Sequence, residues 1–172
     1  MRRFVGRPCS AALVALVALL WAGPASAQSM KQLGVFHDWS AYSAASGTGQ
    51  ICFVVAKPAD VTPTPEGYTQ AYLYLTDRPD AQISNELNLI AGLSLSADQP
   101  ATLAIDGKAF PLLVRGDAVW LKDPTQNSNL AGAMRAGSSL TVDLVSDKGV
   151  KFRETFSLSG ATAASKAMGD GC

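Results

Sequence analysis

The sequence predicts a mainly β protein, a two-sheet sandwich with one or two short peripheral helices. Apolar residues recur at every second position over 51–56 and 71–76, which is the spacing of strands with one buried face. The turns Asp106-Gly107 and Asp147-Lys148-Gly149 each lie between two alternating segments, as in β-hairpins. Short strands at this spacing, separated by turn residues, are typical of a two-sheet sandwich.

Ahead of these strands, residues 1–27 have the three parts of a secretory signal peptide. A basic start is followed by an uncharged apolar run of 12 residues (11–22) and by the small-x-small cleavage site Ala25-Ser26-Ala27. The run is shorter than the roughly 20 residues that a membrane span needs, and no later stretch comes near that length. We therefore expect a mature chain without a transmembrane segment, periplasmic or associated with the cell envelope. The Arg2-Arg3 pair also permits twin-arginine export, but the surrounding consensus is missing.

Removal of this leader changes the charge and size of the protein. The leader carries three arginines and no acids, so 14 Lys+Arg become 11 against 14 Asp+Glu, a net charge of −3. Nucleic-acid binding usually requires a basic excess and is not expected. The remaining 145 residues, 28–172, suit one domain.

The leader also contains one of the three cysteines, Cys9. Cys52 and Cys172 remain, and two cysteines in an exported chain predict one disulfide with only one possible pairing. The alternative is two unrelated thiols.

Three further segments interrupt the strand pattern. The proline-rich stretch 57–68 is an extended connection that could also serve as a recognition loop. Asp123-Pro124 predicts a helix start, with an N-cap acid and proline in the first turn, and Gly137 its end. A second, alanine-rich helix is expected over about 161–168, ending at Gly169.

Taken together, several short motifs resemble the invasion-associated locus B proteins of Gram-negative bacteria over about residues 33–172. The resemblance implies an immunoglobulin-like β-sandwich, an envelope or periplasmic location and, for the founding members, a role in entry into host cells; it implies no reaction. Many relatives carry an additional cysteine close behind the tryptophan of the first motif, but this chain has none there, so only the Cys52–Cys172 bridge carries over. The motifs are Phe36-His37-Asp38-Trp39-Ser40-Ala41-Tyr42, Arg78-Pro79 with Asn85-Glu86, Gly116-Asp117-Ala118-Val119-Trp120, Ala133-Met134-Arg135-Ala136-Gly137, Ser157-Leu158-Ser159-Gly160 and the two cysteines.

The residues predict no catalytic site, metal site or cofactor. The single histidine, His37, is expected on a strand, where Asp38 would point to the opposite face and could not pair with it. Glu66, Glu86 and Glu154 are scattered, so no carboxylate pair is expected. One histidine, two bridged cysteines and turn aspartates do not form a ligand cluster.

Three other residues are ambiguous. Glu154 falls on the apolar face of its strand, so it is either an edge-strand charge or a buried acid paired with Arg115 or Arg135. Trp39 and Trp120 are expected in the core in preference to a binding surface.

Candidate partner surfaces are therefore sought on the outside of the domain. Tyr72 and Tyr74 share one strand face, which is either covered or an aromatic contact surface. Lys148, Lys151 and Arg153 form a basic strip on the last hairpin, either simply solvated or in contact with an anion.

The sequence as a whole predicts an exported protein that binds an unknown envelope or host protein and has no catalytic activity. A small-ligand carrier with an apolar cavity, a structural envelope component and a hydrolase are the alternatives.

The predicted processing can be tested directly. We expect cleavage after Ala27, because the small residues at positions 25 and 27 fit the peptidase pockets. The intact mass of protein recovered from the periplasm should match a chain that begins at Gln28. A recovered species that retains Trp21 would contradict this prediction.

Overall fold

The computed structural model describes residues 30–47 and 49–172, in which eleven strands form one antiparallel sheet. The order in the sheet is β1-β2-β3-β5-β6-β9-β8-β7-β10-β11-β4. The predicted leader and its cleavage site lie outside the described residues. The strands are β1 (Met30–Phe36), β2 (Trp39–Ser46), β3 (Gly49–Ala56), β4 (Asp60–Thr62), β5 (Tyr72–Arg78), β6 (Ile83–Ile90), β7 (Ala101–Ile105), β8 (Lys108–Arg115), β9 (Ala118–Leu121), β10 (Ser139–Val145) and β11 (Lys151–Ser157).

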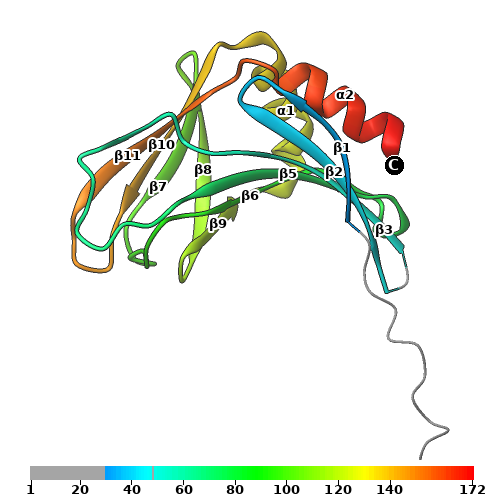
Figure 1. The fold of residues 1–172 in the computed structure, drawn as a ribbon. Coiled ribbons are helices and arrows are strands. Elements are labelled where there is room, and N and C mark those ends of the chain that lie inside the picture. Colours follow the sequence, from blue (N-terminus) through cyan, green and yellow to red (C-terminus); the bar gives the residue numbers. More distant parts are fainter. Residues whose placement is uncertain (1–29, 48) are drawn as a thin grey trace, which may run out of the picture.

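The mainly β prediction is confirmed, whereas the two-sheet sandwich is not, because the hydrogen-bonded order is unbroken from β1 to β4. The sheet bends, so that β7 and β8 run at a steep angle to β5 and β6 (Figure 1). Strand β4 follows β3 after three residues yet pairs with β11 near the far end of the order. The bent sheet encloses one continuous core to which both of its halves contribute.

Both predicted hairpins are present. Strands β7 and β8 are joined by Asp106 and Gly107, whose φ angles of 48° and 81° are the positive pair that a type I′ turn requires. Strands β10 and β11 form the second hairpin, and Gly149 in its turn has a φ of 80°.

The chain reverses between β1 and β2 at His37, and the expectation that His37 lies on a strand is wrong. Its φ is 51°, in the left-handed region, and its side chain is exposed in a turn. The two strands pair with each other, and β2 pairs with β3. Strand β2 has a weak sequence pattern, because its serines and alanines lack the branched side chains that favour strands.

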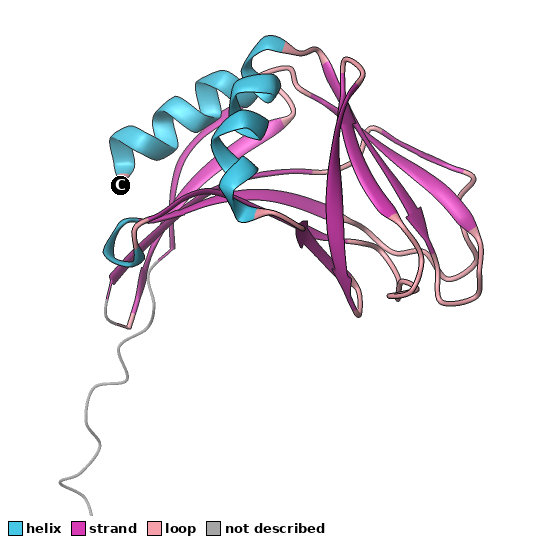
Figure 2. Cartoon of the chain, turned by 180° about the vertical axis from the view of Figure 1, so that it is seen from behind, coloured by secondary structure: helices cyan, strands magenta, loops and turns pink. Residues whose placement is uncertain are grey.

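The two helices lie on the same side of the sheet (Figure 2). A 3₁₀ turn, η2 (Pro124–Gln126), leads into α1 (Asn127–Ala136), and the Asp123 carboxylate accepts the Thr125 N–H as the predicted cap. Helix α2 (Ala161–Gly171) continues beyond the predicted end at Gly169. It contacts β1, β2 and β3, while α1 contacts β6. A second 3₁₀ turn, η1 (Pro79–Ala81), joins β5 to β6.

The start of α2 depends on the glycine at position 160. Gly160 has a φ of 89°, and a Cβ there would lie 1.8 Å from the Phe36 carbonyl oxygen. Only glycine permits this close approach of the helix to the end of β1.

The predicted disulfide joins β3 to the residue that follows α2. Cys52 is fully buried, and its Cα lies 5.9 Å from that of Cys172. The bridge therefore fastens α2 over the strands that it covers, across a sequence separation of 120 residues.

Loss of this bridge should destabilise the fold. On the chain-entropy model, closing a loop of this length stabilises by about 4–5 kcal/mol. We expect Cys172→Ser to lower the free energy of unfolding in urea by up to that amount. Wild-type protein treated with a reductant is the matched control and should fall to the same value. Equal stability of the variant and the oxidised wild type would contradict the prediction.

Candidate functional site

The face of the sheet that turns away from the core carries a row of aromatic side chains. We call it the aromatic face and define it by Tyr42 of β2, Phe53 of β3, Tyr72 and Tyr74 of β5, and Trp120 of β9. All five are half-buried. On β3, β5 and β6 these outward positions alternate with buried residues such as Val54, Leu73 and Leu89, which face the core.

Neighbouring rings of this row are in contact. The Tyr42 and Phe53 rings are stacked with centroids 5.3 Å apart, and Tyr74 meets Phe53 edge-on at 5.9 Å. The Tyr72 and Tyr74 rings are 6.4 Å apart. Burial raises the pKa of the Tyr74 hydroxyl, and the nearby Tyr72 raises it further.

Trp120 extends the row, and the expectation that it lies in the core is wrong. In the cross-strand register Tyr74 pairs with Asn88, Asn88 with Trp120, and Trp120 with Leu113 of β8. Trp39 is fully buried, as predicted, and its indole N–H donates to the Ser157 carbonyl oxygen at 2.9 Å. Trp39 occupies a core-facing position of β2, whereas Trp120 occupies an outward-facing position of β9. The two side chains therefore lie on opposite faces of the sheet.

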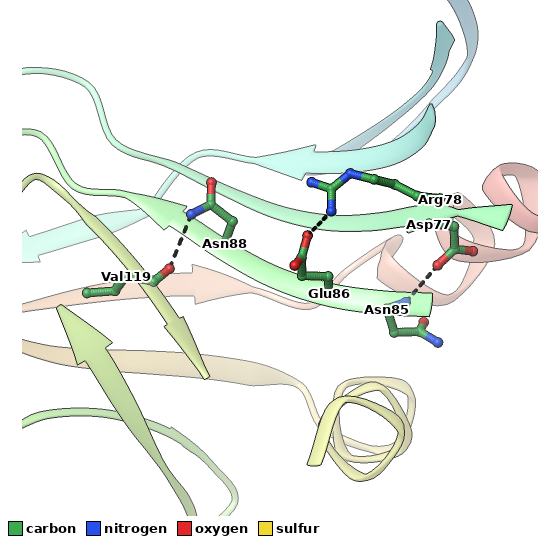
Figure 3. A network of polar contacts seen from close by, with 6 residues as sticks. All are labelled: Asp77, Arg78, Asn85, Glu86, Asn88 and Val119. Carbon is green, nitrogen blue, oxygen red and sulfur yellow. Dashed lines mark hydrogen bonds and ion pairs between the residues drawn. The ribbon is translucent and has the colours of Figure 1, made fainter. Parts of the chain in front are cut away.

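A network of polar contacts joins β5, β6 and β9 on the part of the sheet that carries Tyr74 and Trp120 (Figure 3). Arg78 Nη1 is 2.5 Å from Glu86 Oε2, and these side chains are 38% and 28% exposed. The Asn88 amide donates to the Val119 carbonyl oxygen at 3.3 Å. Where β5 bulges, the Asp77 carboxylate accepts the Asn85 N–H at 2.7 Å and supports the positive φ of Asn85.

Three open depressions follow one another across the face. The first, of about 510 Å³, includes Tyr42 and Tyr72 in its lining. The second, of about 390 Å³, includes Phe53, Tyr74 and the Arg78–Glu86 pair, and the third, of about 370 Å³, shares Trp120 and Glu86 with the second.

Cations lie at both ends of this row. The Lys57 amine is 5.7 Å from the centroid of the Tyr72 ring. Arg115 and Lys122 line the third depression beside Trp120. Among the described residues, none of the three ion pairs involves these cations. Asp38, in the first depression, is the acid at that end.

The predicted basic strip of Lys148, Lys151 and Arg153 is not one patch. Arg153 Nε and Nη2 donate to the two Asp143 carboxylate oxygens, at 2.7 and 2.9 Å. Lys151 lines a depression with this pair, and Lys148 lines a different one beside Asp147. The strip is thus divided between two depressions, and one of its three cations, Arg153, is paired with an acid.

Glu154 is fully buried, as one of the two expectations had it, but the expected arginine partner is wrong, and so is the alternative of an edge-strand charge. Strand β11 is not an edge at this position, because β4 pairs with it and places Val61 opposite Glu154. The hydrogen-bond partner of Glu154 is Tyr68, whose hydroxyl donates to Glu154 Oε1 at 3.0 Å. The other carboxylate oxygen, Glu154 Oε2, has no hydrogen-bond partner among the described residues. Arg115 and Arg135 are exposed.

Tyr68 lies at the end of the proline-rich stretch 57–68, which contains β4 and so acts as a structural connection.

The glutamates that the sequence analysis considered as a carboxylate pair are placed apart in the described part of the structure. Glu86 lies on the aromatic face and Glu154 in the core. No group of three potential metal ligands occurs within residues 30–47 and 49–172. No helix in that same part is long and apolar enough to cross a membrane.

In comparisons with known proteins, no family model, no curated protein and no solved structure matches the chain.

The predicted Tyr72–Tyr74 surface thus exists as an outward-facing pair, but sequence reasoning missed most of its neighbours. Tyr42 and Phe53 join the two tyrosines through the pairing of β2 with β3 and of β3 with β5, and Trp120 does so through the pairing of β6 with β9, about 30 residues further along the chain. A signal was available for Phe53, which alternates with the buried Cys52 and Val54. Trp120 gave none, since β9 has only four residues.

The buried Glu154 should make stability depend on pH. Burial raises the pKa of this carboxyl from 4.5 to about 7, an effect that the Tyr68 hydrogen bond and the Gly92 backbone only partly oppose. The folded state therefore holds the proton more tightly than the unfolded chain, so stability is full below about pH 4.5 and falls as the pH rises towards 7. We expect a loss of about 3 kcal/mol over this interval.

Chemical unfolding of the wild type and of Glu154→Gln between pH 4.5 and 8.5 measures this dependence. The neutral glutamine should remove most of the decline, and Glu86→Gln, which changes an acid on the aromatic face, should leave it in place. A wild-type stability that rises over this interval would contradict the prediction.

Proposed function

We propose that this chain is an exported protein of the cell envelope that acts by binding, without catalysis, through the aromatic face. The observation that carries the proposal is the row of five half-buried aromatic side chains on a sheet face away from the core, of which Tyr42, Phe53, Tyr72 and Tyr74 form a chain of ring contacts. The resemblance to invasion-associated locus B proteins supports an envelope or periplasmic location and suggests a role in host-cell entry. The disulfide fits an oxidising compartment.

The aromatic face is suited to contact because of what it leaves in water. Aromatic side chains contribute large contact areas at a low cost in conformational entropy, and contiguous apolar surface in water favours association. The core has its own apolar residues on the opposite side of these strands, so the five rings are not needed to fill it.

The alternatives fit the geometry less well. A small-ligand carrier needs a concave pocket that buries most of its ligand, whereas the depressions on this face are open. A structural envelope component would also bind through an exposed face, and mapping of its contacts would show the same surface.

The immunoglobulin-like two-sheet sandwich implied by the resemblance also stays a proposal, supported by the single core that the two halves of the bent sheet share.

The test is retention of the purified, oxidised protein on envelope fragments from the source cells. We expect Tyr72→Ser combined with Tyr74→Ser to weaken retention at least tenfold, about 1.4 kcal/mol, because it removes two central rings. Lys151→Glu combined with Arg153→Glu is the matched control and should change retention little, since Arg153 is already paired with Asp143.

Circular dichroism must show that both double variants keep the fold. His37→Ala should also leave retention unchanged, because the proposed binding uses no catalytic base. Unchanged retention by a folded Tyr72/Tyr74 variant would refute the aromatic face as the site.

A further inference from the structure

We propose that the ligand of the aromatic face is an acidic polysaccharide of the cell envelope, an extended chain of sugar rings that carry carboxylates. The inference rests on the proposed function and names the ligand class of the same site. Three properties of the face support it: its length, the polar groups between its rings, and its charge.

The face is long and shallow, as an extended polymer requires. From β2 through β3, β5, β6 and β9 to β8 there are five strand spacings, roughly 24 Å along the sheet. The second and third depressions share Glu86 and Trp120, and the first is lined by Tyr42 and Tyr72, whose rings contact the Phe53 and Tyr74 rings of the second, so one chain could occupy all three in succession. A compact ligand would contact only one of them.

The polar groups favour a sugar over a protein surface. The centre of a protein–protein interface is depleted of charged residues. Here the Asn88 amide lies between Tyr74 and Trp120 in the cross-strand register, and the Arg78–Glu86 ion pair lines the same depression as these residues. A sugar ring presents apolar C–H groups on its faces and hydroxyls around its rim, so it can pack on the rings while its hydroxyls bond to Arg78, Glu86 and Asn88.

The charge of the face selects an anionic sugar. Its depressions are lined by Lys57, Arg78, Arg115 and Lys122 against Asp38 and Glu86, an excess of two positive charges. The exported chain as a whole would carry a net charge of −3. The aromatic face is therefore positively charged on a protein whose net charge is negative, and it attracts carboxylates. The Arg115 guanidinium can bind one carboxylate through two parallel hydrogen bonds.

Trp120 makes this binding directly measurable. The exported chain keeps two of the three tryptophans, Trp39 and Trp120, and Trp39 is fully buried. A ligand on the aromatic face should therefore change the emission of Trp120 alone. We expect saturable quenching by oligogalacturonate, at least tenfold weaker binding of a neutral galactan of the same length, and no quenching by poly-L-glutamate.

Charge variants make the test specific to this face. Arg115→Ser with Lys122→Ser should raise the dissociation constant for oligogalacturonate at least tenfold and reduce its dependence on salt. Lys148→Ser with Lys151→Ser removes the same charge elsewhere and should leave the dissociation constant unchanged. The Trp120→Phe variant should lose the fluorescence quenching, and calorimetry should still detect oligogalacturonate binding to it. This pair of measurements checks that the quenching reports binding at the aromatic face.

Two results would overturn the inference: no binding of oligogalacturonate, or equal binding of poly-L-glutamate with equal losses in both charge variants, which would mean non-specific attraction. If oligogalacturonate fails to bind while the Tyr72/Tyr74 variant still loses retention on envelope fragments, the proposed function stands with a different partner class, such as a protein. If that variant keeps its retention, the proposed function itself fails.

Discussion

The contact between Trp39 and the end of β11 holds together strands from opposite parts of the sheet order. The indole of β2 is completely buried and donates to the Ser157 carbonyl oxygen, and the next residue back, Asp38, donates its backbone N–H to Ser159 at 3.3 Å. A third link, from Ala59 N–H to the Thr155 carbonyl oxygen, brings β4 to the same strand. Without these links the sheet could open, and the single core would be exposed along one side.

The links between β2, β4 and β11 also determine which face of the sheet is turned to the core and which face is turned outward. Once β11 meets β2 and β4, the inward faces are filled by Phe152, Phe156 and their neighbours, and α2 lies on β1, β2 and β3. On the remaining face of β3, β5, β6 and β9, the side chains of Phe53, Tyr74 and Trp120 stay half-buried in the part of the chain that the structure describes. The exposed rings are thus a result of topology as much as of the amino acids themselves.

Local patterns in the sequence were sufficient for the hairpins, the capped helix and the buried Trp39. The arrangement of the strands was beyond them, because the pairs β6–β9, β7–β10 and β4–β11 join segments that are distant in the chain. The same limit explains the two errors at the site. Trp120 owes its exposure to its neighbours in β6 and β8, and Glu154 owes its hydrogen bond to Tyr68, 86 residues away in a connection without strand or helix pattern.

The position of the two cysteines has a consequence for the order of assembly. Cys172 follows all eleven strands and both helices, while Cys52 lies in the third strand. In a chain delivered from its N-terminus, Cys52 has to wait until every other element has arrived. Between residues 28 and 172 no other thiol competes for it. The native bridge can therefore form only after α2 has been delivered and Cys172 can reach Cys52.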